Sequence, residues 1–263
     1  MHLPMPETPA DPVGQRAHDH ARIRRALTVS MAFVLALLAI FSAQMSVDLR
    51  ALMIAPHTVE GLIGIAAAPL LHGSFEHVMA NSISLLLLGT LAGSVYPRAT
   101  RRALPLIWFA SGACAWLLGD AGSHHLGASG ITHGLMFLVF VLGLLRRDRA
   151  AIASAMIAFM LYGGMLLTVL PQEPGVSWQA HLGGALGGIV AAFLFRRRDP
   201  EAPRRKYSWD IEEELAAEAA RRDHDQYEPP HPRDVPVLWR RGEAHASDAR
   251  RGVVLPFRTR RDE

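Results

Sequence analysis

The sequence predicts an all-α polytopic membrane protein, a bundle of six membrane-spanning helices with a long first loop at the membrane interface. Half of the 263 residues are hydrophobic. Most of these gather in nearly uncharged runs of about 18 to 20 residues, enough to cross a hydrocarbon core of ~30 Å. Arginines recur in every second connection between the runs. The expected spans are residues 27–47, 76–96, 103–119, 128–146, 150–170 and 178–196.

A polar segment precedes the first span. Residues 1–25 are rich in Pro, Asp, His and Arg and have no apolar period, which predicts a flexible cytoplasmic arm. This leader is long, and the apolar run after it is longer than the hydrophobic region of a signal peptide. Both features favour a membrane span over a signal peptide for residues 27–47.

Arginine placement predicts the orientation of the spans. Basic residues precede the first span, follow the sixth and occupy two connections, whereas the opposite loops contain only Arg50. By the positive-inside rule both termini are cytoplasmic, in a multi-pass protein of the cell membrane. The basic residues do not line one face, which argues against nucleic acid as a partner despite the net charge of +3. The basic residues on the predicted cytoplasmic side are Arg22, Arg24, Arg25, Arg98, Arg101, Arg102, Arg146, Arg147, Arg149, Arg196, Arg197 and Arg198.

The expected membrane domain, residues 26–198, contains one long loop. Residues 48–75 carry apolar side chains among Pro and Gly, and this apolar content argues against disorder. We expect short helices there, lying partly in the outer membrane interface.

Residues 199–263 form a charged cytoplasmic tail. Its mixture of acidic residues, basic residues and prolines cannot build a large core, so most of it is expected to be disordered. Asp210 and Glu213 have the spacing of a capping box, which predicts a short helix at 210–223.

Ser129 lies where a loop enters the fourth span, in the stretch Gly127-Ala128-Ser129-Gly130. A serine in an apolar helix most often bonds to its own helix or lets helices pack. In a first helical turn, however, its N–H has no intrahelical acceptor, and the helix N-terminus favours negative charge. Ser129 is therefore a candidate nucleophile at a position suited to holding an oxyanion.

His181 lies at the start of the sixth span, on the same predicted side as Ser129. An ionisable residue in a span indicates function by default, and a packing histidine is the alternative. A neutral imidazole there could accept the proton of Ser129. Gly184 and Gly188 are four residues apart, and such spacing lets helices approach closely enough to bring the two side chains together.

His77 and Asn81 share one helix face near the outer end of the second span. Two adjacent donors suit a developing oxyanion, and polar residues that hold helices together are the alternative. His72 precedes them in the loop and is expected to hold that loop in place.

The sequence does not contain the residues that a metal-dependent or an aspartyl active site would need. The single cysteine, Cys114, excludes a disulfide within the chain and a multi-cysteine metal site. Glu76 and His77 lack the second histidine of the His-Glu-x-x-His motif, and the spans contain no paired aspartates. No metal is therefore expected.

These motifs resemble those of the rhomboid intramembrane serine proteases over residues 27–197. The G-x-S-G pattern is met by Gly127, Ser129 and Gly130. The other two patterns are H-x-x-x-x-H-x-x-x-N and A-H-x-x-G-x-x-x-G. They are met by His72, His77, Asn81, Ala180, His181, Gly184 and Gly188.

The resemblance implies Ser129 as nucleophile and His181 as general base and acid, with an oxyanion hole from the Ser129 N–H, His77 and Asn81. It implies neither a metal nor an organic cofactor. It further implies substrates that are single-pass transmembrane proteins in the lipid bilayer. The minimal form, without an evident organelle-targeting leader, predicts a bacterial inner membrane as the location.

Two features depart from the family pattern. Rhomboids commonly carry a tyrosine four residues after the serine, packed on the catalytic histidine, where this chain has His133. We expect His133 to be able to stack on His181 in its place. The Trp-Arg pair often found in the first loop is missing.

The function expected from these residues is an intramembrane serine endopeptidase with a Ser-His dyad. One alternative is a catalytically weak or silent rhomboid-like scaffold that binds transmembrane helices without cutting them. The other is a small transporter using His72, His77 and His181 as a proton path, which predicts internal repeats that the sequence does not display.

Overall fold

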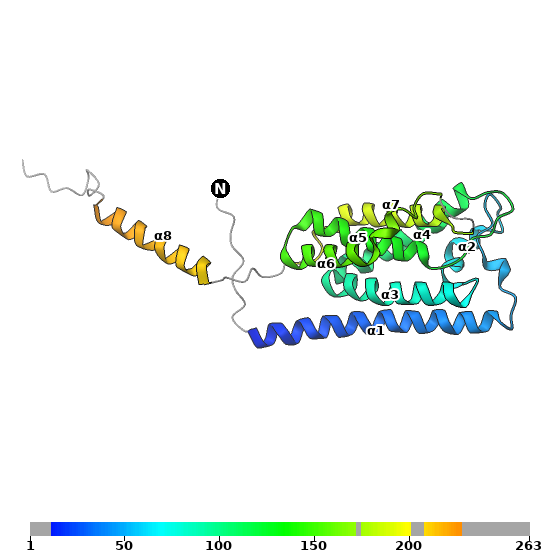
Figure 1. Ribbon diagram of the computed structural model, residues 1–263, viewed down its shortest axis with the longest axis horizontal. Helices are drawn as coiled ribbons and strands as arrows, with labels where there is room; N and C mark the ends of the chain where they lie inside the picture. The colour runs from blue at the N-terminus through cyan, green and yellow to red at the C-terminus, as the bar shows by residue number, and fades with distance from the viewer. Residues whose placement is uncertain (1–11, 172–174, 201–207, 228–263) are drawn as a thin grey trace, which may run out of the picture. The chain divides into compact units, whose positions relative to one another are not determined.

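The computed structural model describes residues 12–171, 175–200 and 208–227, and this part of the chain is helical apart from turns, loops and one isolated β-bridge (Figure 1). Contacts divide the chain into two units, residues 1–205 and 206–263. The first unit contains α1 (Pro12–Gln44), α2 (Leu62–Ala67), α3 (Phe75–Val95), α4 (Pro97–Leu118), α5 (Ser129–Arg146), α6 (Arg149–Tyr162) and α7 (Trp178–Phe195). Three 3₁₀ turns accompany them, η1 (Arg50–Leu52), η2 (Ala68–Leu70) and η3 (Gly163–Leu166).

Five helical segments among the described residues are long and apolar enough to cross a membrane. They are Arg16–Gln44, Phe75–Val95, Ser129–Arg146, Arg149–Leu166 and Trp178–Phe195. The predicted third span, 103–119, falls on α4, which is not one of the five. Arg98, Arg101 and Arg102 lie in its first two turns and limit its uncharged part to residues 103–118. The chain is thus a multi-pass membrane protein, and a sixth span stays a prediction.

The first and fifth predicted segments differ from the helices observed. The helix α1 begins at Pro12, so residues 12–25 of the expected arm are helical, and residues 1–11 lie outside the described part of the chain. Proline suits the first helical turn, and the Ala and Arg that follow favour the helix. The α-helical part of the fifth span ends at Tyr162, because Gly163 and Gly164 have low helix propensity.

The helix α7 packs against both α4 and α5 at the centre of the bundle, and its glycines form these contacts. A Cβ on Gly184 or Gly188 would overlap the carbonyl oxygens of Gly130 and Gly134 on α5. A second row, Gly183 and Gly187, faces α4. A Cβ on Gly187 would lie 3.0 Å from the Cβ of Ala110. The two rows therefore let α7 approach both helices to backbone contact.

A second small-residue contact joins α1 to α3, which run side by side (Figure 1). A Cβ on Gly89 would lie 2.6 Å from the hydroxyl oxygen of Ser30, and a Cβ on Gly93 would lie 3.1 Å from the Cβ of Ala26. This contact between α1 and α3 was not predicted from the sequence.

The long first loop packs on α4 through two tryptophans. The indole N–H of Trp116 donates to Thr58 O at 2.8 Å, and that of Trp108 donates to Ala66 O at 3.1 Å. The loop contains the short helix α2, with Ile63 and Val59 exposed. Its placement in the membrane interface stays a prediction.

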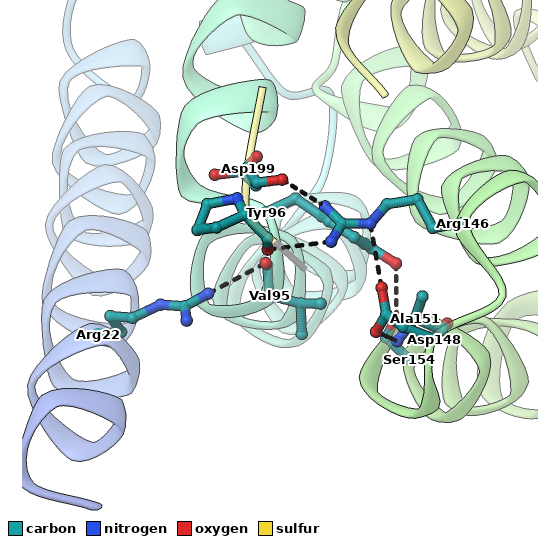
Figure 2. A network of polar contacts seen from close by, with 9 residues as sticks. Arg22, Val95, Tyr96, Arg146, Asp148, Ala151, Ser154 and Asp199 are labelled. Atoms are coloured by element: carbon teal, nitrogen blue, oxygen red, sulfur yellow. Dashed lines mark hydrogen bonds and ion pairs between the residues drawn. The ribbon is translucent and has the colours of Figure 1, made fainter. Parts of the chain in front are cut away.

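A polar network ties the helix ends opposite the first loop (Figure 2). The Asp199 carboxylate accepts hydrogen bonds from the N–H groups of Arg98 and Ala99, both at 2.8 Å. These are orphan donors of the first turn of α4. The Arg146 guanidinium donates to Asp199 O at 3.1 Å and to the Asp148 carboxylate at 3.1 Å, and lies over the ring of Tyr96. The network therefore joins the ends of α4, α5, α6 and α7.

Replacing Asp199 with alanine should destabilise the bundle, because the part-buried N–H of Arg98 and the buried N–H of Ala99 both lose their acceptor. We expect the melting temperature of the detergent-solubilised protein to fall by about 2 to 8 °C. Asp48→Ala is the matched control, since Asp48 pairs with Arg50 in solvent, and it should leave the melting temperature unchanged. Equal melting temperatures for wild type and Asp199→Ala would contradict the capping role.

In the second unit, α8 (Ser208–Tyr227) covers the segment where a short helix at 210–223 is expected. The rest of the predicted disordered tail, residues 201–207 and 228–263, lies outside the described residues.

Candidate active site

Ser129 is the first residue of α5, and the chain reaches it through a turn that requires glycine. Gly127 has φ of +110°, a conformation that side chains other than glycine rarely adopt. A Cβ at Gly127 would also lie 2.6 Å from the His77 ring. Gly127 N–H donates to Ala68 O at 2.9 Å, which ties the turn to the first loop. The turn therefore brings His77 close to the residues that precede Ser129.

Ser129 and His181 meet across the contact between α5 and α7. The His181 Nε2 atom lies 2.9 Å from the Ser129 hydroxyl oxygen, and Nδ1 lies 3.0 Å from the carbonyl oxygen of Thr168. A carbonyl oxygen can only accept, so a neutral His181 carries its proton on Nδ1. The lone pair of Nε2 then faces the Ser129 hydroxyl, which is the arrangement required of a general base.

Gly130 lets three helices converge beside this pair. A Cβ there would overlap the Ser111 hydroxyl of α4 and would lie 2.7 Å from Ala180 O of α7. The Ser111 hydroxyl donates to the same Ala180 oxygen at 3.0 Å. Gly130 therefore fixes the spacing of α5 and α7 one residue away from both Ser129 and His181.

His133 stacks on His181, with ring centroids 3.9 Å apart and planes inclined by 12°. Its Nδ1 lies 2.7 Å from Ser129 O, and its Nε2 lies 2.8 Å from the Thr168 hydroxyl. His133 is only 4% exposed. The imidazole thus occupies the place expected for the tyrosine of the family pattern and adds two hydrogen bonds.

His72 connects the end of α1 to the turn before Ser129. Its backbone exchanges two hydrogen bonds with the Gln44 amide, at 3.0 and 3.2 Å, and its Nε2 accepts the Ala128 N–H at 3.4 Å. Burial and the neighbouring His77 lower the pKa of His72 to about 4. The ring is therefore uncharged at neutral pH, as an accepting Nε2 requires.

His77 and Asn81 lie on the first turns of α3, which begins after the N-cap residue Ser74. The rings of His72 and His77 are in edge contact, with centroids 5.0 Å apart. Asn81 is 4% exposed, and its Nδ2 group has no protein partner among the described residues. This amide is consequently a buried donor with unused capacity on the same helix as His77.

Another histidine, His125, contacts two serines outside this site, and its Nε2 atom lies 2.9 Å from the Ser123 hydroxyl oxygen. The His125 Nδ1 atom is 2.7 Å from the hydroxyl of Ser177, the residue that caps α7. His125 also pairs its backbone with Ile54 of the first loop at 2.9 and 3.0 Å. This contact holds together the loop before Ser129 and the start of α7.

Sequence reasoning missed Thr168, Gln44 and Ser111 as neighbours of the site. Thr168 contacts His181 through its backbone carbonyl, and Gln44 contacts the backbone of His72, and no residue pattern marks either contact. Ser111 resembles any serine within an apolar helix.

Comparison with known proteins gives the family. The family model of the Rhomboid domain matches residues 59–198, more than half of the chain. An uncharacterized protein of Mycobacterium bovis is 42% identical over 165 residues, which cover 58% of this chain and 65% of the relative. An uncharacterized protein of Mycobacterium leprae is 39% identical over 153 residues, covering 55% and 59%.

A more distant relative carries a functional name. The Bacillus subtilis protein "Putative rhomboid protease YdcA" is 28% identical over 180 residues, which cover 62% of this chain and 86% of the relative. The matches to the two mycobacterial relatives cover less than two thirds of the length of those proteins. The matched domain includes every residue from His72 to Gly188 discussed above. This chain belongs to the rhomboid family.

Proposed function

We propose that this chain is an intramembrane serine endopeptidase that cleaves transmembrane segments of single-pass membrane proteins. The observation that carries the proposal is the hydrogen bond of 2.9 Å between the Ser129 hydroxyl and Nε2 of His181, in the tautomer set by Thr168 O. A serine is a weak nucleophile unless an adjacent base accepts its proton.

The reaction proceeds through an acyl-enzyme. The Ser129 hydroxyl oxygen attacks the scissile carbonyl while His181 Nε2 takes the hydroxyl proton. His181 then gives this proton to the departing amine. A water molecule, deprotonated by the same nitrogen, hydrolyses the ester and restores Ser129.

Three donors suit the oxyanion of the tetrahedral intermediate. The Ser129 N–H belongs to the first turn of α5, where the helix provides no acceptor for it. His77 lies against Gly127, and the Asn81 amide has an unused buried N–H. Donors fixed in a buried site stabilise developing charge more than they would in water.

The protease domain extends over residues 26–198, in a cell membrane of the bacterial inner-membrane type with both termini cytoplasmic. We assign α4 as the sixth span, because at ~1.5 Å per residue its 22 residues reach about 33 Å. The arginine-rich helix ends then share one side, as the positive-inside rule requires. The serine and the histidine lie toward the opposite side.

The experiment that tests the function uses the purified protein in liposomes with a tagged single-pass transmembrane protein. We expect fragments whose new ends lie within or next to the transmembrane segment, identified by mass spectrometry. A scaffold would bind the same substrate without cutting it. Co-purification of intact substrate, with no fragment from any of several single-pass proteins, would favour the scaffold.

A further inference from the structure

Thr168 lies in a turn that no predicted motif includes. The α-helix ends at Tyr162, and η3 (Gly163–Leu166) leads into turns closed by Leu167 N–H to Gly164 O and Leu170 N–H to Leu167 O. This path brings Thr168 back toward the starts of α5 and α7. Had α6 continued as a regular helix, the backbone carbonyl of Thr168 would have bonded within that helix.

Two different groups of Thr168 contact the two histidines. Its carbonyl oxygen lies 3.0 Å from His181 Nδ1, and its hydroxyl oxygen lies 2.8 Å from His133 Nε2. The imidazoles therefore stack on each other and bond to the same residue.

The contacts close a ring that returns to the serine. From Ser129 Oγ it passes to His181, then to Thr168, then to His133, and His133 Nδ1 meets Ser129 O at 2.7 Å. Its members come from α5, α7 and the turn after η3. Rotation of either imidazole would break two of these bonds at once.

The donor and acceptor of each hydrogen bond in the ring follow from what each group can donate or accept. Ser129 O can only accept, so His133 donates through Nδ1. An uncharged His133 has no second N–H, so its Nε2 accepts the single hydroxyl proton of Thr168. The alternative acceptor for that proton is Met165 O, at 3.2 Å. A charged His133 would instead donate to the Thr168 oxygen, and the hydroxyl proton would go to Met165 O. A positive charge on His133, 3.9 Å from the His181 ring, would oppose protonation of His181 during attack.

We propose that Thr168 is the positioning residue of this site. Its carbonyl fixes the tautomer of His181, and its hydroxyl holds His133 against the ring of His181. The proposal rests on the function proposed above for its effect on rate, but the hydrogen-bond ring itself can be tested without activity.

The test compares Thr168→Val and Thr168→Ser by the rate at which a fluorophosphonate probe labels Ser129. Valine keeps the carbonyl and the shape but removes the hydroxyl, so we expect labelling to slow about 3- to 10-fold, the effect of one hydrogen bond. Serine restores the hydroxyl and should return the rate to within about 2-fold of wild type. Thr100→Val is the matched control, because it loses one buried hydrogen bond, from its hydroxyl to Ala92 O, at the opposite helix ends from Ser129.

NMR separates the proposed role of Thr168 from the proposed protease function, because it reports the histidine tautomers without any activity. In protein labelled with ¹⁵N-histidine, NMR should find His181 protonated on Nδ1 in wild type, and should find the His133 nitrogen signals shifted in Thr168→Val. An Nε2-protonated His181, or equal labelling rates for wild type and Thr168→Val, would overturn the inference. Absence of labelling in folded wild type would contradict the proposed function instead, and the tautomer would still decide the role of Thr168.

Discussion

Ser129→Ala should abolish cleavage of a single-pass substrate, with a loss of about 10⁴-fold or more. The reason is that the variant has no oxygen to form the acyl-enzyme, and His181 has nothing to deprotonate. The fold should be kept, because the change removes one hydrogen bond, of 2.9 Å, and no buried apolar contact. The measurement is fragment yield over time in liposomes, with melting temperature recorded for the same preparation.

Ser84→Ala provides the comparison for this variant. Ser84 lies on α3 within the membrane-spanning segment and outside the site, so cleavage should be unchanged. If Ser129→Ala cut substrate at the wild-type rate, another nucleophile would have to be sought.

Gly184→Ala should impair both folding and activity, because its Cβ would overlap the carbonyl oxygen of Gly130. The Gly130 oxygen belongs to the backbone and cannot rotate away as a flexible side chain could. The helices α5 and α7 must therefore separate. Overpacking of this kind costs about 1–3 kcal/mol. A shift of about 1 Å between Ser129 and His181 would lower activity by about 10²-fold.

Gly164→Ala is the matched glycine control. A Cβ at Gly164 would meet nothing within 4 Å, so stability and cleavage should stay close to wild type. Both variants are compared by thermal unfolding and by cleavage per folded molecule. Wild-type activity in Gly184→Ala would show that close contact between α5 and α7 is not what aligns the pair.

The sequence was most informative where side-chain chemistry and helix boundaries coincide. The predicted spans 128–146 and 178–196 lie within a residue of α5 and α7 at both ends, because small residues or serine mark their starts and arginines mark their ends. Gly184 and Gly188 could be assigned to a helix contact, since small residues four apart have few other uses in a span. Ser129 and His181 were found through the same two segments.

The rest depends on contacts that no local pattern encodes. Thr168 reaches His181 through a backbone carbonyl, a group that every residue has. Asp199 caps a helix that begins about 100 residues earlier in the chain, at Pro97. The charge near the start of α4 is visible in the sequence, but the position of its cap is set by tertiary packing.

The first loop shows a similar limit. Its apolar residues correctly argued for ordered structure, and α2 with η2 lies there. Its attachment to α4 by Trp108 and Trp116 could not be foreseen, because both indoles bond to backbone carbonyls.

The most direct test of the central claim is whether His181 activates Ser129. Purified wild-type protein and His181→Ala are treated with a fluorophosphonate probe in detergent, and the adduct is located by mass spectrometry. We expect an adduct on Ser129 in wild type and its loss in His181→Ala, with both proteins folded. An unlabelled Ser129 in folded wild type, or equal labelling of Ser129 without His181, would contradict the account.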